Sequence, residues 1–211
     1  QMSIFYDRKY DVPKNKLSKY QSKTNFPSTH QFSLSEVANG SRVLDIGCGN
    51  SLLAKELIKK GCLVDTVDCE EPEWKSKVYQ YIKLNLNDAE INLKIDNYDY
   101  ILLLDVLEHI EEPEKFVLKL KKSPKGRYPK IIVSVPNIGF FIMRVQLFLG
   151  NFNYGIRGIL DLGHRRLFTF RTIQELFKQA GYKILKIRGV PAPIPLALGH
   201  NWVSSGLLKM N

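Results

Sequence analysis

The sequence is poor in cysteine and has no long uninterrupted apolar stretch. Its three cysteines, Cys48, Cys62 and Cys69, contain no C-x-x-C pair and form an odd set. This argues against a disulfide framework and against a cysteine-rich zinc site. No run reaches the roughly 18 apolar residues of a membrane-spanning helix, and the polar N-terminus lacks the apolar core of a secretory signal. We therefore expect no transmembrane segment and a reducing, cytoplasmic environment.

Acidic residues are scarce relative to basic ones. Asp and Glu number 21 against 31 Lys and Arg, which gives a formal net charge of +10. Such an excess attracts nucleic acid, anionic lipid or an acidic substrate. The length of 211 residues and a hydrophobic content of 44% otherwise fit one domain with a sizeable core. We expect this domain at residues 29–211, preceded by a polar, lysine-rich arm or cap at residues 1–28.

The most informative stretch is residues 42–50, Arg-Val-Leu-Asp-Ile-Gly-Cys-Gly-Asn. It predicts a short buried strand, a glycine turn and then a helix, an arrangement that places backbone N–H groups beside a ligand space. Asp45 would repel a pyrophosphate but suits a ligand with a positively charged amino group. Leu52 also stands where the dinucleotide-binding fingerprint has its third glycine. A nicotinamide dinucleotide is therefore disfavoured.

Strand and helix patterns alternate along the chain. This alternation predicts a doubly wound α/β fold with a mostly parallel sheet. Beyond the first strand, we expect strands at residues 62–68, 78–84, 98–105, 130–136 and 182–188. We expect helices at residues 29–38, 52–58 and 113–121, and a last helix from Thr169 or Thr172 to Gly181. At the start of this last helix, Thr172-x-x-Glu175 has the form of a capping box.

Polar residues follow several of these strands, and in such sheets ligands bind beyond the carboxyl ends of the strands. Asp68 ends the second strand about 20 residues after the glycine turn, where a carboxylate accepts both hydroxyls of a ribose. Asn85 and Leu86 follow the third strand, and the segment from Asp105 to His109 follows the fourth. Their convergence predicts a nucleoside-binding site.

Asp45-x-Gly47-x-Gly49 resembles the first motif of class I S-adenosylmethionine-dependent methyltransferases. The segments Asp-Val-Leu-Glu-His at 105–109 and Leu-Gly-His-Arg-Arg-Leu-Phe-Thr at 162–169 are similar to those of small-molecule members such as the ubiquinone-pathway O-methyltransferases. The resemblance implies a Rossmann-like fold and S-adenosyl-L-methionine as cofactor. The cofactor-binding residues that we expect are Asp45, Gly47, Cys48, Gly49, Asp68, Cys69, Asn85, Leu86 and Asp105. Asn85 departs from the acid that the family often has beside adenine.

The family also expects one further, antiparallel strand at the end of the chain. Residues 190–211 show no convincing pattern for it. Either the chain is truncated before that strand, or a loop replaces it.

Two histidines are candidates for a general base, because the pKa of an imidazole lies near working pH. They are His109 and His164; a purely structural role is the alternative for each. Asp105, Glu108 and His109 also match, with Asp in place of the first Glu, an E-x-x-E-H arrangement that binds a divalent metal in some ubiquinone-type enzymes. Carboxylates and imidazoles suit Mg²⁺ or Zn²⁺. We predict no metal and keep this set as the alternative.

Residues 137–166 form a long, largely apolar insertion that we interpret as a helical lid over the acceptor. A homodimer face and an interfacial membrane helix are the alternatives. The arginines at 144, 157, 165 and 166 would suit an anionic acceptor, although a solvated surface role fits at least two of them.

The sequence thus predicts a methyltransferase that acts on oxygen or nitrogen of a small or carrier-linked metabolite, of sugar, lipid or polyketide type. The alternatives are a non-catalytic scaffold that binds S-adenosylmethionine and a nucleic-acid methyltransferase. The positive charge keeps the latter open. However, no Asn-Pro-Pro-Tyr or Asp-Pro-Pro-Tyr motif follows the fourth strand, so we expect no stable nucleic-acid partner.

Overall fold

The computed structural model describes residues 28–49, 53–71, 78–88, 93–121, 126, 128–155 and 158–190. Within these ranges, five parallel strands form one sheet in the order β3-β2-β1-β4-β5. The strands are β1 (Arg42–Ile46), β2 (Leu63–Asp68), β3 (Gln80–Lys83), β4 (Tyr100–Leu104) and β5 (Lys130–Ser134). The doubly wound, Rossmann-like α/β fold that the alternating pattern predicts is confirmed.

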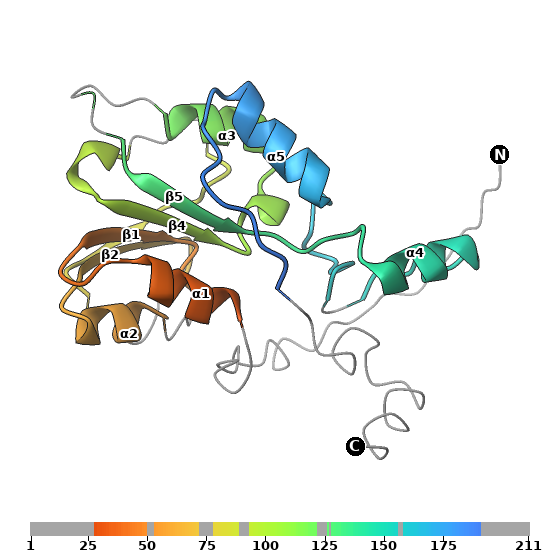
Figure 1. Cartoon of the computed structure of the whole chain (residues 1–211), viewed down its shortest axis with the longest axis horizontal. Coiled ribbons are helices and arrows are strands. Elements are labelled where there is room, and N and C mark those ends of the chain that lie inside the picture. The colour runs from red at the N-terminus through yellow and green to blue at the C-terminus, as the bar shows by residue number, and fades with distance from the viewer. Residues whose placement is uncertain are drawn as a thin grey trace, which may run out of the picture.

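Helices cover both faces of the sheet (Figure 1). They are α1 (Thr29–Glu36), α2 (Leu53–Lys59), α3 (Pro113–Lys119), α4 (Phe141–Phe148) and α5 (Phe170–Gln179), with 3₁₀ helices at Ile95–Asn97 and Leu107–His109. α1 and α2 lie against one face, and α3 and α5 against the other. None of the helices in the described ranges combines the length and apolarity that crossing a bilayer requires.

The alternation of side chains along β1 explains why the sheet needs both layers of helices. Leu44 and Ile46 belong to the apolar cluster with α3 and α5, whereas Val43 packs with α2 on the opposite face. All three side chains are fully buried, as expected for a central parallel strand covered on both faces. β1 lies between β2 and β4, so the strand order reverses beside it, at the position where ligands bind in this class of fold.

The predicted strand at residues 182–188 is wrong. Residues 182–190 form no ladder, and Leu185 and Ile187 are 71% and 49% exposed. Alternating side chains alone do not make a strand, because a strand also needs a neighbouring strand to complete its backbone hydrogen bonds. Residues 182–190 pair with no described strand, and β5 remains the edge of the described sheet. Residues 1–27 and 191–211, which include most of the predicted arm and nearly all of the tail, lie outside the described residues.

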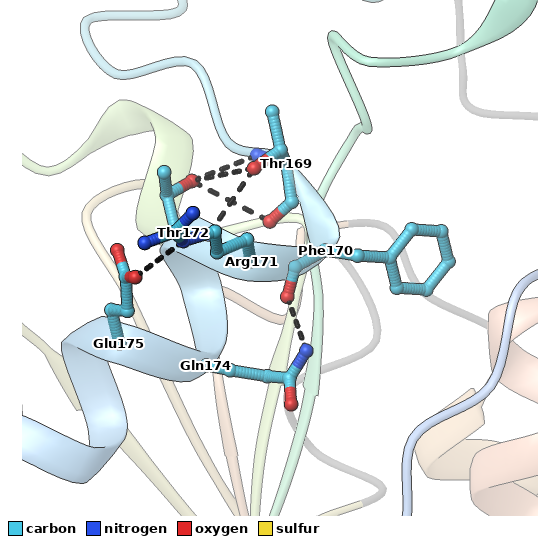
Figure 2. A network of polar contacts seen from close by, with 6 residues as sticks. All are labelled: Thr169, Phe170, Arg171, Thr172, Gln174 and Glu175. Atoms are coloured by element: carbon cyan, nitrogen blue, oxygen red, sulfur yellow. Dashed lines mark hydrogen bonds and ion pairs between the residues drawn. The ribbon is translucent and has the colours of Figure 1, made fainter.

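The predicted capping box at the start of α5 has the wrong register. Thr169 is the N-cap, and its Oγ1 accepts a hydrogen bond from the Thr172 N–H, while Thr172 Oγ1 accepts one from the Thr169 N–H (Figure 2). Thr172 therefore closes the box from the third helical position. Glu175 instead binds Arg171 at 2.7 Å. A hydroxyl at that position can take the place of the usual Glu or Gln, because both accept from the N-cap N–H.

Candidate functional site

The glycine turn after β1 has one tightly packed glycine and one open glycine. Gly47 has φ +71°, and a Cβ there would lie 2.5 Å from Cγ2 of Val106. Gly49 has φ +48° and no heavy atom within 4 Å of an added Cβ. The first glycine is therefore needed for packing between the ends of β1 and β4. The second leaves backbone that a ligand can approach closely.

Asp45 is a buried carboxylate with an unsatisfied oxygen. Its side chain lies near the carboxyl end of β1 and is 3% exposed, and Oδ2 has no hydrogen-bond partner among the described residues. Burial and the nearby charge of Asp68 raise the pKa of Asp45 to about 7. Burying such a group without a partner is costly, and a positively charged ligand group would supply the missing partner.

Asp68, at the end of β2, ties the second strand to the glycine turn. Its Oδ2 accepts a hydrogen bond from the Gly49 N–H at 2.7 Å, and its Oδ1 accepts one from the Glu70 N–H at 3.1 Å. An ionised carboxylate has about four acceptor positions, so it can still receive hydroxyl groups. The geometry therefore orients a carboxylate beside the open backbone of Gly49.

The two cysteines of the predicted site are poorly suited to act as nucleophiles. Cys48 is buried, and burial raises the pKa of its thiol. Cys69 is exposed; desolvation first and then the Asp68 charge raise its pKa as well. A raised pKa favours the thiol over the thiolate, which is the reactive form. Their contribution to a ligand site would be contact rather than chemistry.

The loop after β3 is held by its own amide groups. Asn85 Oδ1 accepts a hydrogen bond from the Asn87 N–H, and Asn85 Nδ2 donates one to Asp88, each at 3.1 Å. Leu86 packs against the core cluster on the α3 and α5 face. Asn87 Oδ1 accepts a hydrogen bond from the Glu111 N–H at 2.9 Å. These contacts join the ends of β3 and β4, and the contact of Asn85 with adenine stays a prediction.

Asp105 has an unusual backbone and a partner that the sequence did not indicate. Among the described residues it is the only non-glycine residue with positive φ, at +55°. Its N–H donates to the carbonyl oxygen and to Oγ of Ser134, and its Oδ1 accepts a hydrogen bond from Ser134 Oγ at 2.8 Å. The left-handed conformation costs roughly 1–2 kcal/mol. Ser134, at the end of β5, thus fixes the turn that leads from β4 into the site.

The 3₁₀ helix that follows carries Glu108 and His109 toward a distant segment. The Glu108 carbonyl oxygen accepts hydrogen bonds from the N–H groups of Arg165 and Arg166 at 2.7 and 3.0 Å. This places His164 beside His109, with ring centroids 4.9 Å apart in an edge-to-face arrangement. The sequence singled out both histidines separately. Their proximity was not predicted, because it depends on a contact between residues more than 50 positions apart.

Backbone carbonyls orient both imidazoles. His109 Nδ1 lies 3.0 Å from the Gly163 oxygen, and His164 Nδ1 lies 2.9 Å from the Ile159 oxygen. A carbonyl accepts hydrogen bonds only, so these contacts assign the proton of each neutral ring to Nδ1. The lone pair then remains on Nε2, available to a proton or an ion.

Glu108 completes a cluster of three donors. It is 1% exposed, and neither of its carboxylate oxygens has a hydrogen-bond partner among the described residues. Burial first, and then the charge of Asp105, raise its pKa to about 8. Ligand atoms of Glu108, His109 and His164 lie within 4.8 Å of one another. A carboxylate with two imidazoles suits a divalent metal. This set differs from the metal-binding alternative of the sequence, Asp105, Glu108 and His109, because His164 takes the place of Asp105.

The arginines of the insertion divide into two groups. Arg165 pairs with Glu111 at 2.9 Å, and Arg166 pairs with Glu114 at 2.8 Å. Their charges are thereby satisfied at the surface, in agreement with the alternative of solvated arginines. Arg144 instead borders a cavity of about 570 Å³, and Arg157 lies outside the described residues. The cavity is lined by Asn137, Gly139, Phe140, Phe141, Arg144, Thr169, Phe170 and Arg171.

Comparison with known proteins identifies related sequences and folds. A family model described as a methyltransferase domain matches residues 15–187. A ubiquinone biosynthesis O-methyltransferase of Coxiella burnetii is 34% identical over 85 residues, which are 37% of this chain and 36% of that protein. A similar enzyme of Rickettsia bellii is 30% identical over 95 residues, 40% of this chain and 38% of that protein. The match thus spans little more than a third of these relatives.

Solved structures share the fold at low sequence identity. The 1,6-didemethyltoxoflavin-N1-methyltransferase of Burkholderia thailandensis, solved with bound S-adenosylhomocysteine, matches with a TM-score of 0.54 and 19% identity. The match covers 77% of this chain and 69% of that one. The fold and the sequence family therefore agree.

Proposed function

The chain belongs to the class I S-adenosylmethionine-dependent methyltransferases, and on that basis we propose that it methylates an oxygen or nitrogen of a small or carrier-linked metabolite. The observation that carries the proposal is the unsatisfied, buried carboxylate of Asp45 beside the open backbone of Gly49. A positively charged amino group satisfies this carboxylate, whereas a pyrophosphate would be repelled. The residues therefore fit S-adenosylmethionine.

The cofactor residues have distinct roles in this proposal. Asp45 pairs with the amino group, and Asp68 accepts the hydroxyls of the ribose, because its carboxylate is already oriented by the Gly49 N–H. Asn85 and Leu86 flank the adenine. Asp105, held by Ser134, closes the site from the end of β4.

When bound, S-adenosylmethionine supplies a methyl group that is already activated on a sulfonium. The residues of the chain then need to align the acceptor and take up its proton. Nε2 of His109 is the base in our proposal, and His164 contacts the same ring edge to face. The cavity beside Thr169 offers aromatic side chains and the guanidinium group of Arg144 to the rest of the acceptor, whereas Arg171 is paired with Glu175. An acceptor with an anionic group, of sugar, lipid or polyketide type, fits this lining.

Replacement of Asp68 by Ala is expected to weaken binding of S-adenosylmethionine at least tenfold, because two hydrogen bonds to a charged acceptor contribute about 1.5–3 kcal/mol each. Calorimetric titration with S-adenosylmethionine and S-adenosylhomocysteine measures this. Glu70→Ala, a neighbouring exposed acid, is the control and should bind like the wild type. Equal affinity of all three proteins would contradict the assignment of Asp68.

Replacement of His109 by Ala should lower kcat about 10²–10⁴-fold, the usual contribution of a positioned general base, while cofactor affinity stays unchanged. His164→Ala should have a smaller effect, because this ring contacts His109 rather than taking the proton. The measurement is turnover on an acceptor panel, with His30→Ala in α1 as control. Wild-type turnover in His109→Ala would remove the base from the proposal.

The donor cluster favours a second candidate role, in which Glu108, His109 and His164 hold a divalent ion that binds the acceptor. Chelation followed by addition of Mg²⁺ or Zn²⁺ distinguishes the two roles. Loss of turnover that the ion restores would favour the metal. Turnover insensitive to chelation would favour the base.

Two rival functions predict different results. A non-catalytic domain would bind S-adenosylmethionine but show no turnover on any acceptor. A nucleic-acid methyltransferase would bind RNA or DNA with strong salt dependence. The first rival is tested by the acceptor panel and the second by a salt titration with labelled oligonucleotides.

A further inference from the structure

We propose that α4 docks the protein onto an anionic lipid surface. The contact residues are Phe141, Val145, Phe148 and Leu149, which we call the α4 apolar face. They are 72%, 41%, 90% and 66% exposed. Phe141 and Arg144 also border the cavity beside Thr169, so the docked lipid surface would adjoin that cavity.

The spacing of these residues places them on one side of the helix. Positions i, i+4, i+7 and i+8 form a continuous apolar stripe on an α-helix. Met143, on the opposite side, is buried and holds the helix from behind. Leu147 lies near Met143 and is 59% exposed, so apolar exposure is concentrated on the outward stripe but not confined to it. Figure 1 shows α4 projecting away from the sheet, beyond the end of β5. Large apolar side chains concentrated on a projecting element mark an interaction surface.

The apolar surface continues past the end of the helix. Phe152 and Tyr154 are 45% and 44% exposed, and their rings contact each other edge to face with centroids 5.8 Å apart. Tyrosine prefers the boundary between headgroups and acyl chains, and phenylalanine is common on the inserted face of interfacial helices. The helix and the loop behind it therefore present a surface suited to shallow insertion, to a depth of about 5–10 Å.

Charge indicates the kind of surface that α4 meets. Residues 137–160 contain Arg144 and Arg157 and no Asp or Glu, in a chain with a net charge of +10. Arg144 lies three residues after Phe141 and four before Phe148, which places it at the rim of the apolar face. No ion pair of Arg144 is found within the described residues, unlike Arg165 and Arg166. An anionic headgroup would provide its counter-charge.

A second copy of the chain fits this surface less well. A stable protein interface buries about 800 Å² on each partner. The α4 apolar face together with Phe152 and Tyr154 supplies an area of that order, since a large aromatic buries about 150–250 Å², so charge decides between the two occupants. Two copies would also bring two strongly positive chains together. A bilayer needs no matching pocket, and its anionic lipids relieve the charge.

Sedimentation of the full chain with lipid vesicles tests the proposal. We expect binding to phosphatidylcholine vesicles that contain an anionic lipid such as phosphatidylglycerol, and at least tenfold weaker binding to phosphatidylcholine alone. Phe148→Ser/Leu149→Ser should lower binding to the anionic vesicles at least tenfold, because burial of two large apolar side chains is lost. Arg144→Gln should lower it about fivefold, since one basic residue near an anionic surface contributes about that factor.

The control is Leu185→Ser/Ile187→Ser, which removes two other exposed apolar side chains, 71% and 49% exposed, from another part of the chain. This variant should bind vesicles like the wild type, and far-UV circular dichroism shows whether each variant is folded. Unchanged vesicle binding of a folded Phe148→Ser/Leu149→Ser protein would overturn the proposal. It would equally be overturned if the wild type ignored vesicles but formed a dimer that these substitutions dissociate.

Discussion

Replacement of Asp45 by Asn is expected to weaken binding of S-adenosylmethionine by more than about a hundredfold and, at pH 8, to raise the stability of the unliganded protein. Both effects have one cause. Asp45 is buried with an unpartnered oxygen, so its negative charge is unfavourable until a positively charged ligand arrives. Loss of a partner from a buried charge pair costs about 3–5 kcal/mol, which accounts for the loss of affinity.

The pH dependence of stability follows from the raised pKa of Asp45. Its pKa is about 7 in the folded protein against 3.8 in the ordinary state, so the folded state holds an additional proton between these values. Stability due to this residue is therefore highest below about pH 4 and falls as pH rises toward 7. Above pH 7 the ionised side chain costs about 4 kcal/mol, since one pKa unit corresponds to 1.36 kcal/mol.

Chemical denaturation of the wild type and Asp45→Asn at several pH values measures the effect. Near pH 4 the two proteins should have similar free energies of unfolding, because Asp45 is neutral in the folded state. At pH 8 the variant should be more stable by about 2 kcal/mol. This is the cost of about 4 kcal/mol for the ionised Asp45 side chain minus the cost of burying the unpartnered Asn amide. Taking the difference between the two proteins removes the contribution of Glu108, which titrates in the same direction.

Asp65 provides a control with the opposite expected sign. It is also fully buried in the sheet, but Oδ2 accepts hydrogen bonds from Arg42 at 3.1 Å and from the Tyr98 hydroxyl at 2.8 Å. Asp65→Asn should therefore lower stability by about 1–3 kcal/mol without affecting the cofactor. If Asp45→Asn were destabilising at pH 8 like Asp65→Asn, then Asp45 would have a structural partner rather than an open ligand position.

Replacement of Gly47 by Ala should lower the free energy of unfolding by about 2–5 kcal/mol, through two additive causes. The residue has φ +71°, which costs a residue with a Cβ roughly 1–2 kcal/mol. The new Cβ would also lie 2.5 Å from Val106, and overpacking of this kind costs typically about 1–3 kcal/mol. Denaturation in urea measures the sum, and the double variant with Val106→Ala should recover part of the loss.

Two other glycines separate these causes and connect them to ligand binding. Gly40 has φ +73° and open space around it, so Gly40→Ala should show the backbone cost alone. Gly49→Ala should show a similar small loss of stability, because its Cβ also meets no protein atom. It should nevertheless weaken cofactor binding at least tenfold, since the Cβ would occupy the ligand space. Unimpaired binding in Gly49→Ala would mean that the ligand does not approach this turn.

Much of the candidate site was predictable from local sequence. The apolar run before Gly47 and the run at 98–105 each predict a buried strand, and the alternation of strands and helices along the chain predicts parallel order. Because parallel strands end at the same edge, the sequence predicts that Asp45, Asp68 and Asp105 lie near one another, and the structure shows an interaction between the charges of Asp45 and Asp68. The division of residues into an arm, a domain and a lid stays a prediction, as do the individual ligand contacts.

Long-range contacts decided the remainder. The sequence determined which elements form and that the ends of the strands converge, because side-chain periodicity and turn residues act over a few neighbouring positions. Only the tertiary structure brought His164 to His109 through the Glu108 carbonyl, and gave Asp105 its partner Ser134. It also left residues 182–190 without a ladder, since a strand exists only where a neighbouring backbone completes its hydrogen bonds, and no local pattern supplies that neighbour.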